Sequence, residues 1–528
     1  MLVWILRHML GKLASVMAMA GLRLPSVRLA PTQDERADAS RAAAPAEPHE
    51  KWATWGAARD GARVVATRAQ VCALVLVAAA YVTLLVARPR AGLIILLELV
   101  AALYFLAGFH KLRLLLRGES ARTQLEPVAD LKATHLPMYT VLVPLHREGR
   151  IVPALVERLQ RIDYPPARLQ VLLLVETDDE ETQAAIEQHP LPRHIRPMLM
   201  PPGEPRTKPR ALNIGLQDAK GEYIVIYDAE DQPDPDQLRK AVAAFRSLPR
   251  EVVCVQARLL FYNRTQSLLA RLFAIDYAVW YHQFLPGLTK GLTRPGSFVP
   301  LGGTSNHFRV EELRRMGGWD PFNVTEDCDL GVRLGRRGSR VAMLDSTTWE
   351  EAVPYAGAWV RQRSRWVKGY LQTYLVHMRH PLQLFRQLGP RGFLDFQALV
   401  GASSLLLLIN PLMWLLTLAY MVGKGTPFGG FIESLYPPAV YYPALLSLVV
   451  WNFIFFYSNA YVCVRHGFID LTRYALLTPV YWALMSVGAW MGLISLIHNP
   501  FYWAKTEHGV SLPRVDASPV LAMPQSDA

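Results

Sequence analysis

The chain has little cysteine for its length, and its cysteines form no pattern of metal ligands or disulfides. Its 528 residues include 4 cysteines, without the paired spacing that zinc sites and small disulfide scaffolds use. They are Cys72, Cys254, Cys328 and Cys463, and the first and last lie in apolar runs. We therefore expect free thiols in a reducing compartment.

The N-terminal region lacks a strong signal-peptide cleavage site, and the chain shows no internal repeat. Residues 1–22 place basic side chains among Leu, Val and Met, a pattern typical of an amphipathic surface helix rather than a cleaved signal. Residues 27–50 are rich in Ala, Pro, Arg and Glu, which favours a disordered linker. We expect residues 1–68 to form an amphipathic and disordered cytosolic segment.

Apolar residues, in contrast, are abundant. They make up 51% of the chain, mean hydropathy is +0.14, and there are 13 Trp and 21 Tyr. This composition predicts an integral membrane protein with aromatic side chains at the lipid–water interfaces. The net charge of +12 is explained better by anionic lipid and a nucleotide diphosphate than by nucleic acid, because much of it lies beside apolar segments or in residues 361–368.

Two closely spaced apolar runs, 70–87 and 91–109, predict a transmembrane hairpin within residues 69–118. Basic residues are more numerous on its two outer flanks than in its turn, so both flanks are predicted to be cytosolic. Further apolar runs occupy 397–421 and 438–463. A third, 474–497, either crosses the bilayer or lies along its surface, and we favour the surface because that keeps the following polar tail cytosolic.

Between these apolar regions the chain alternates β-branched runs with helical stretches, which predicts a cytosolic α/β domain. The expected organisation is a hairpin, a catalytic domain over 119–357, interface helices over 358–396, transmembrane helices over 397–464, an interface helix with a loop over 465–510, and a disordered tail over 511–528.

Several predicted strands of this domain end in polar residues, where open parallel sheets bind their ligands. One strand ends at Pro144 and is followed by Glu148, and another ends at Glu176. The acidic loop after Glu176 equally fits the cap of a helix beginning near Glu180. A basic turn at Lys208 enters a helix and could hold a phosphate.

The strand 223–227 ends in Asp228-Ala-Glu230-Asp231. Oxygen ligands placed at one strand end can hold Mg²⁺ or Mn²⁺ against a diphosphate and so stabilise a departing nucleotide. Taken alone, the pattern would more often be a solvated turn.

Downstream, the small-residue loop 301–306 gives an acceptor room to approach the backbone. The run Thr325-Glu326-Asp327 begins a predicted helix, so it supplies either an ordinary helix start or a general base for a sugar hydroxyl.

A later helix is predicted to place Gln362, Arg365 and Trp366 on one face, since they are spaced i, i+3 and i+4. An indole can stack on a pyranose ring while a guanidinium binds a diphosphate. The same residues would suit a helix anchored at lipid headgroups.

In this order the motifs resemble the membrane-embedded family 2 glycosyltransferases, which include cellulose, curdlan, chitin and hyaluronan synthases. The resemblance covers roughly residues 70–510. It implies a GT-A fold, which is Rossmann-like, with inverting single displacement, a nucleotide-sugar donor and divalent Mg²⁺ or Mn²⁺.

The resemblance also implies site residues. Asp327 would be the catalytic base, flanked by Glu326 and Thr325. The donor would contact Pro144, Glu148, Glu176, Lys208, Asp228, Gln362 and Arg365, and the acceptor Gly303, Thr304, Ser305 and Trp366. A gating loop would contain Trp503, Lys505, Thr506 and His508. The metal would be held among Asp228, Glu230 and Asp231. The chain departs from the family pattern where Asp228-Ala-Glu230 replaces Asp-x-Asp, leaving Asp231 as a rival ligand, and where Glu176 replaces an aspartate.

Within the family, the run from Trp349 to Tyr370 is most similar to bacterial exopolysaccharide synthases near curdlan synthase. The expected protein is a multi-pass enzyme of the bacterial inner membrane that adds hexose, with UDP-glucose favoured, to a growing β-glycan and passes it across the bilayer. The alternatives are transfer of one sugar to a lipid carrier, and a transporter or scaffold with an inactive nucleotide-binding domain.

Overall fold

The computed structural model describes residues 61–119, 135–290 and 298–502. The predicted N-terminal amphipathic helix and linker lie outside these ranges, as do the gating-loop residues Trp503, Lys505, Thr506 and His508. All four cysteines fall within the described residues and are free thiols, three of them buried.

The first described elements are two consecutive helices, α4 (Arg68–Ala87) and α5 (Pro89–Glu119). No residue of α4 is buried by other parts of the chain, so its apolar surface is suited to lipid. Helix α5 extends well beyond the predicted apolar run because its second half packs on the α/β domain. There, Gly118 lies against the carbonyl of Gln283, and Gly287 lies against that of Leu114.

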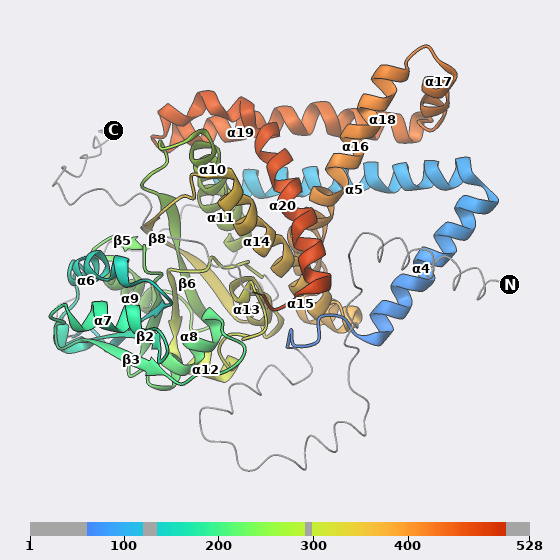
Figure 1. Ribbon diagram of the computed structural model, residues 1–528. Coiled ribbons are helices and arrows are strands. Elements are labelled where there is room, and N and C mark those ends of the chain that lie inside the picture. Colours follow the sequence, from blue (N-terminus) through green and yellow to red (C-terminus); the bar gives the residue numbers. More distant parts are fainter. Residues whose placement is uncertain (1–60, 120–134, 291–297, 503–528) are drawn as a thin grey trace, which may run out of the picture.

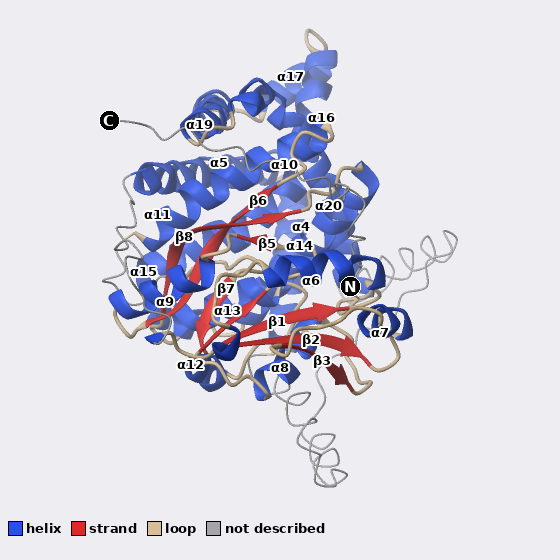
Figure 2. Ribbon diagram, turned by 90° about the vertical axis from the view of Figure 1, so that its left-hand side faces the viewer, coloured by secondary structure: helices blue, strands red, loops and turns tan. Residues whose placement is uncertain are grey.

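The α/β domain is built on an eight-stranded mixed sheet in the order β3-β2-β1-β4-β7-β6-β8-β5 (Figure 2). The strands are β1 (Tyr139–Leu145), β2 (Leu169–Glu176), β3 (Ile195–Met200), β4 (Tyr223–Ile226), β5 (Gln232–Pro233), β6 (Val252–Phe261), β7 (Asn306–Arg309) and β8 (Arg340–Glu350).

The chain direction within this sheet fixes where a ligand can bind. Strands β3, β2, β1 and β4 are parallel, and β7 runs antiparallel to both β4 and β6. The connections after β1 run toward β2 and β3, whereas β4 lies on the other side of β1. Ligands of open α/β sheets bind at such a reversal, beyond the carboxyl ends of the strands. The residues after β1 and β4 are therefore expected to contact a ligand.

Helices cover the sheet and complete two buried cores. Val171, Leu173 and Val175 of β2 belong to one core, and Leu172 and Leu174 to the other, as expected for a central strand buried on both faces. The helices of this domain are α6 (Val152–Gln160), α7 (Glu180–Glu187), α8 (Lys208–Gln217), α9 (Gln237–Ser247), α10 (Leu268–Val279), α11 (Leu285–Thr289), α12 (Val310–Met316) and α13 (Glu326–Arg336).

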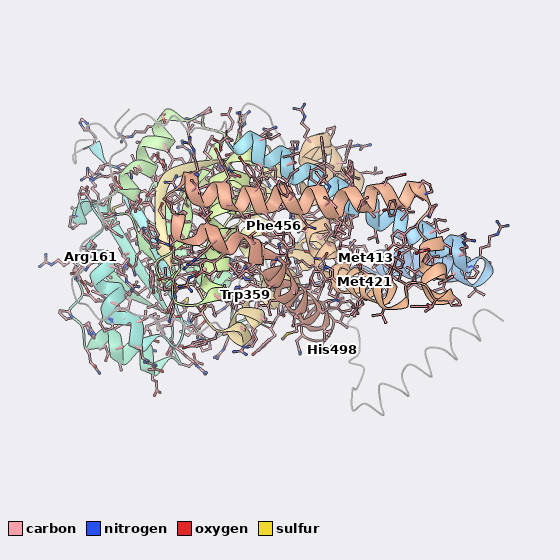
Figure 3. The ribbon with its side chains drawn as sticks, turned by 90° about the horizontal axis from the view of Figure 1, so that it is seen from above. Arg161, Trp359, Met413, Met421, Phe456 and His498 are labelled. Carbon is pink, nitrogen blue, oxygen red and sulfur yellow. The ribbon has the colours of Figure 1, made fainter. Side chains whose placement is uncertain are left out.

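The remaining helices follow the sheet. They are α14 (Ala356–His377), α15 (Pro381–Phe396), α16 (Ser403–Gly423), α17 (Pro427–Ser434), α18 (Pro438–Leu446), α19 (Asn452–Arg465) and α20 (Thr478–His498). In the described part of the chain, five helical segments are long and apolar enough to cross a membrane: 68–87, 89–119, 381–423, 438–465 and 469–498. Seen from above, Arg161 of the α/β domain and Met421 of α16 lie on opposite sides of the molecule (Figure 3).

The last of these segments, which contains α20, is apolar enough to span, yet its packing differs from that of the others. It runs beside α14 and across the direction of α5 and α19 (Figure 1). Gly492 of α20 lies close to the backbone of Ser364, and Lys368 donates to the carbonyls of Asn499 (3.2 Å) and Tyr502 (2.7 Å). These contacts support a position along the membrane surface, which we propose for α20.

Candidate active site

A single cavity of about 1190 Å³ begins at the carboxyl ends of β1 and β4 and continues between the apolar helices. At the sheet end it is lined by Pro144, Glu148, Glu176, Lys208 and Asp228. At the helical end its lining comes from α5, α16, α19 and α20. These motifs, which are scattered along the sequence, therefore share one cavity with the apolar helices.

Lys208, the first residue of α8, organises the acidic turn after β4. Its Nζ donates to Oδ1 of Asp228 and to the carbonyl of Gly303 (2.8 Å). Burial alone would lower the pKa of Lys208, but the carboxylates of Asp228 and Glu326 outweigh it and raise that pKa. Lys208 thus remains an ammonium ion that joins the acidic turn to the loop 301–306.

Two predicted site residues point away from the cavity. Oδ2 of Asp231 accepts from the backbone N–H of Asp228 (2.7 Å) and from the hydroxyl of Thr304. These two hydrogen bonds hold the turn in place. Ser305 is fully buried, and its hydroxyl donates to Thr348 (2.7 Å). Neither residue lines the cavity. These hydrogen bonds support the turn, and we propose that role for Asp231 and Ser305 in place of direct metal or acceptor binding.

A third carboxylate, for which no role was predicted, lies beside the acidic turn. Glu350, the last residue of β8, lines the cavity beside Asp228 and Glu230. Burial, followed by repulsion from Asp231 and Glu230, raises the pKa of Glu350 well above its usual value. Such crowding of carboxylates favours a bound cation. Its sequence signal was weak because Glu350 lies more than 100 positions after the turn.

The described residues include no group of three or more His, Cys, Asp or Glu side chains placed to hold a metal ion. Asp228 and Glu230 nevertheless both line the cavity. Mg²⁺ commonly takes one or two protein carboxylates and completes its coordination with water and substrate phosphate oxygens. The donor set therefore fits a cation that binds together with a diphosphate.

Thr325, Glu326 and Asp327 lie at the start of α13 and line the same cavity. Thr325 makes no side-chain capping bond, so it is not the ordinary helix cap that the sequence also allowed. Oδ1 of Asp327 accepts from the N–H of Cys328 (2.7 Å), and Oδ2 faces Gly303. Burial raises the pKa of Asp327. Burial and the neighbouring Asp327 carboxylate raise the pKa of Glu326 to about 7. A carboxylate with a raised pKa is a better proton acceptor.

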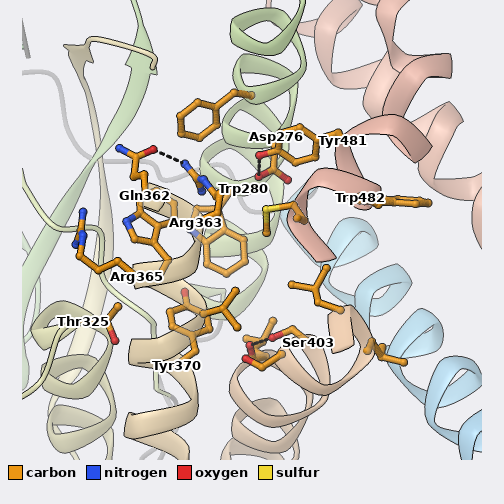
Figure 4. A pocket seen from close by; sticks show the side chains of 18 of the residues that line it. Asp276, Trp280, Thr325, Gln362, Arg363, Arg365, Tyr370, Ser403, Tyr481 and Trp482 are labelled. Carbon is orange, nitrogen blue, oxygen red and sulfur yellow. Dashed lines mark hydrogen bonds between the residues drawn. The ribbon is translucent and has the colours of Figure 1, made fainter. Parts of the chain in front are cut away.

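Helix α14 brings Gln362, Arg365 and Trp366 to the cavity from another side (Figure 4). Their neighbour Arg363, for which no role was predicted, is buried. Its guanidinium carbon lies 3.5 Å from the centre of the Trp366 ring. The same guanidinium lies 4.0 Å from the ring centre of Phe273. Arg363 therefore covers one face of the Trp366 indole, and a sugar could stack only on the other face.

Glu176 ends β2 at the opposite side of the site. Its Oε1 accepts from Arg210 (3.2 Å), while its buried Oε2 has no hydrogen-bond partner in the described structure. Burial raises the pKa of Glu176, and Arg210 partly offsets that rise. Oε2 is thus the carboxylate oxygen of Glu176 that has no partner in the described structure.

Residues 137–369 match the family model described as "Glycosyltransferase like family 2". This chain therefore carries a family 2 glycosyltransferase domain, and its mixed sheet with flanking helices is a GT-A-like fold. This match favours an enzyme over a transporter or scaffold with an inactive nucleotide-binding domain.

Among curated proteins, the chain is 24% identical to "Probable glycosyltransferase YdaM" of Bacillus subtilis, over 48% of this chain and 60% of that protein. It is 27% identical to "Glucomannan 4-beta-mannosyltransferase 2" of Arabidopsis thaliana, over 51% and 49%. It is 26% identical to "Beta-monoglucosyldiacylglycerol synthase" of Synechocystis, over 52% and 57%. The chain thus spans about half to three fifths of the length of these relatives.

A solved structure, the mannosyltransferase PcManGT of Pyrobaculum calidifontis in complex with GDP-Man and Mn2+, aligns with a TM-score of 0.42 at 23% identity. The alignment covers 67% of this chain and 99% of that one.

Proposed function

We propose that the protein is a processive, inverting β-glycosyltransferase of the bacterial inner membrane, with a cytosolic catalytic domain. It would extend a growing glycan with hexose from a nucleotide sugar. The observation that carries this proposal is the continuity of the cavity from Asp327 into the space between the apolar helices. The deep part is lined by aromatic and amide side chains suited to a polyhydroxyl chain, including Asn410, Trp414, Trp451 and Asn452.

In the proposed reaction the acceptor hydroxyl attacks the anomeric carbon of the donor sugar from the face opposite the diphosphate. Asp327 takes the hydroxyl proton as the new C–O bond forms. The bond from the anomeric carbon to the diphosphate breaks, and its electron pair goes to the diphosphate oxygen. Lys208 and Arg365 line the cavity as cations that can stabilise this charge. A divalent cation, Mg²⁺ or Mn²⁺, held by Asp228 and Glu230 would neutralise the same charge.

The nucleoside end of the site favours uracil as the base. Glu176 has one unpartnered oxygen because Arg210 binds the other. Uracil offers a single ring N–H donor at its pairing edge, whereas guanine offers a ring N–H and an adjacent amino group and pairs best with two acceptors. UDP-glucose is therefore the donor we favour.

A second candidate function is transfer of a single hexose to a membrane lipid. It is favoured by the relative named as a glucosyldiacylglycerol synthase and by the leucine and methionine side chains in the deep cavity, such as Leu406 and Met413. Both functions need Asp327, so loss of activity in a base variant would not separate them.

The two functions differ in their products. Detergent-purified protein should be incubated with a panel of UDP- and GDP-sugars, and any product digested with linkage-specific hydrolases. The proposal expects an insoluble or high-molecular-mass glycan from a UDP-hexose. A lipid-extractable product carrying one sugar would instead establish the second function.

A further inference from the structure

Two charged side chains, Asp276 and Lys111, line the cavity without a role in the proposed transfer step. Asp276 belongs to α10 and Lys111 to α5. Asp276 keeps solvent-accessible surface although both its chain neighbours are buried, and this surface faces the cavity. Its Oδ2 accepts from the hydroxyl of Tyr481 (3.0 Å), the bond drawn in Figure 4.

Lys111 lies near the end of α5 that packs on the catalytic domain. Its Nζ is 5.1 Å from the ring centre of Phe455. No carboxylate in the described structure lies within ion-pair distance of it, and Asp276 acts on it only at longer range. Ionisable residues on apolar helices that face a cavity are costly to keep unpaired and are typically functional.

A π-helical turn, η5 (Trp280–Phe284), directly follows the helix that carries Asp276. Such turns are frequent at functional sites. The turn begins with Trp280, which lines the cavity, as does Trp482 of α20. The charged pair is thus accompanied by aromatic side chains, the combination with which proteins bind pyranose rings.

The charges of Asp276 and Lys111 suit some possible ligands of the cavity better than others. A sugar hydroxyl can donate to a carboxylate and accept from an ammonium group, so vicinal hydroxyls satisfy both side chains. A phosphate group would be attracted by Lys111 but repelled by Asp276, so the two side chains together do not select it. An acyl chain would leave the Lys111 ammonium group without a partner in an apolar space.

We propose that Asp276 and Lys111 form a hydroxyl-binding subsite for the neutral glycan within this cavity. The subsite holds a sugar unit already added to the chain, so it determines how long the glycan stays bound between transfers. Tyr481 positions the carboxylate. The proposal rests on the proposed function, because a non-processive enzyme would not need such a subsite.

The test compares Asp276→Asn and Lys111→Met, which preserve side-chain size, with Asp470→Asn. The control removes a carboxylate paired with Arg264 at 3.5 Å outside the cavity. For each purified variant, three quantities are measured: UDP affinity, the KM for a neutral β-glucan tetrasaccharide, and the length distribution of the product.

Both variants should raise the KM for the tetrasaccharide by about 10-fold or more, the worth of a hydrogen bond to a charged group. They should also shorten the product, with UDP affinity unchanged and Asp470→Asn like wild type. Wild-type KM and product length in the two variants would overturn the subsite. If Asp276→Asn does not fold, Lys111→Met alone decides.

Failure of the subsite is distinguishable from failure of the proposed function. In the first case wild-type protein makes polymer and the variants match it. In the second, wild-type protein makes no polymer from any nucleotide sugar. A product with one sugar on a lipid, together with a raised KM for that lipid in Lys111→Met, would also overturn the proposal, because the pair would then bind a lipid headgroup.

Discussion

Gly369 offers a direct test of how α14 positions the catalytic base. A Cβ placed on Gly369 would lie 2.8 Å from Cβ of Thr325 and still closer to its hydroxyl and methyl group. Thr325 cannot move aside freely, because its backbone N–H donates to Oδ1 of Asn323 (3.0 Å) and Asn323 donates to Thr373 of α14 (3.0 Å). The substitution Gly369→Ala should therefore push α14 away from the start of α13.

The expected size of the effect follows from this geometry. Overpacking of a close contact costs about 1–3 kcal/mol of folding free energy. A displacement of about 1 Å at a catalytic group can lower the rate by about 100-fold. Because Asp327 is only two residues from Thr325 whereas the nucleoside contacts come from β1 and β2, kcat should fall while UDP affinity is kept.

The matched control is Gly357→Ala in the first turn of the same helix. There a Cβ would meet only the guanidinium of Arg361, at an ordinary 3.6 Å, so the control should keep wild-type activity. Sugar transfer, UDP affinity and thermal unfolding are measured for both variants. Wild-type kcat in Gly369→Ala would refute the conclusion that α14 fixes the base.

Four further predictions follow from the site. Asp327→Asn should lower transfer by about 100-fold or more with UDP binding nearly intact, because it removes the proton acceptor; near-normal turnover would exclude Asp327 as the base. Asp228→Ala should abolish metal-dependent donor binding measured by calorimetry, and full wild-type activity in excess chelator would exclude a metal role. Trp366→Ala should reduce polymer output more than UDP affinity in the same detergent-purified sample, whereas unchanged output would indicate an interfacial anchor. Burial would raise the pKa of Asp329, but Arg333 and His377 override it and lower the pKa to about 2, so these contacts should contribute stability above about pH 4 that is lost as pH falls toward 2; thermal unfolding of Asp329→Asn should therefore lose less stability than wild type between pH 4 and pH 2, and an equal loss in both would exclude this contribution.

The sequence predicted three of the eight strands, those at β1, β2 and β4, because uninterrupted Val, Ile and Leu runs indicate parallel strands buried on both faces. The polar residues that follow those strands were also predictable, since parallel strands present their carboxyl ends at one edge. Asp228 and Lys208 line the cavity for this reason, whereas Asp327 reaches it from the start of α13.

The direction of individual side chains was not predictable. Asp231 and Ser305 have the same residue types as true site residues, and only the hydrogen bonds of the turn show that they face inward. Similarly, nothing in the spacing of Arg363 indicates that it covers one face of Trp366. Such features depend on packing between distant segments.

The orientation of the last apolar segment also depended on tertiary contacts. Its length and hydropathy suit both a membrane span and a surface helix. The close approach of Gly488 and Gly492 to α14 is a long-range contact that hydropathy does not encode. The role proposed for Asp276 was likewise not predictable, because it depends on how α10 and α5 are placed around one cavity.

The most direct test of the proposed function is the length of the product made from a single donor. Purified protein in lipid nanodiscs is incubated with radiolabelled UDP-glucose, and the product is separated by size and by lipid extraction. The proposed function predicts labelled chains of many sugars from the wild type and none from Asp327→Asn. Label confined to a lipid carrying one sugar, or no transfer from UDP-glucose or any other nucleotide sugar, would contradict it.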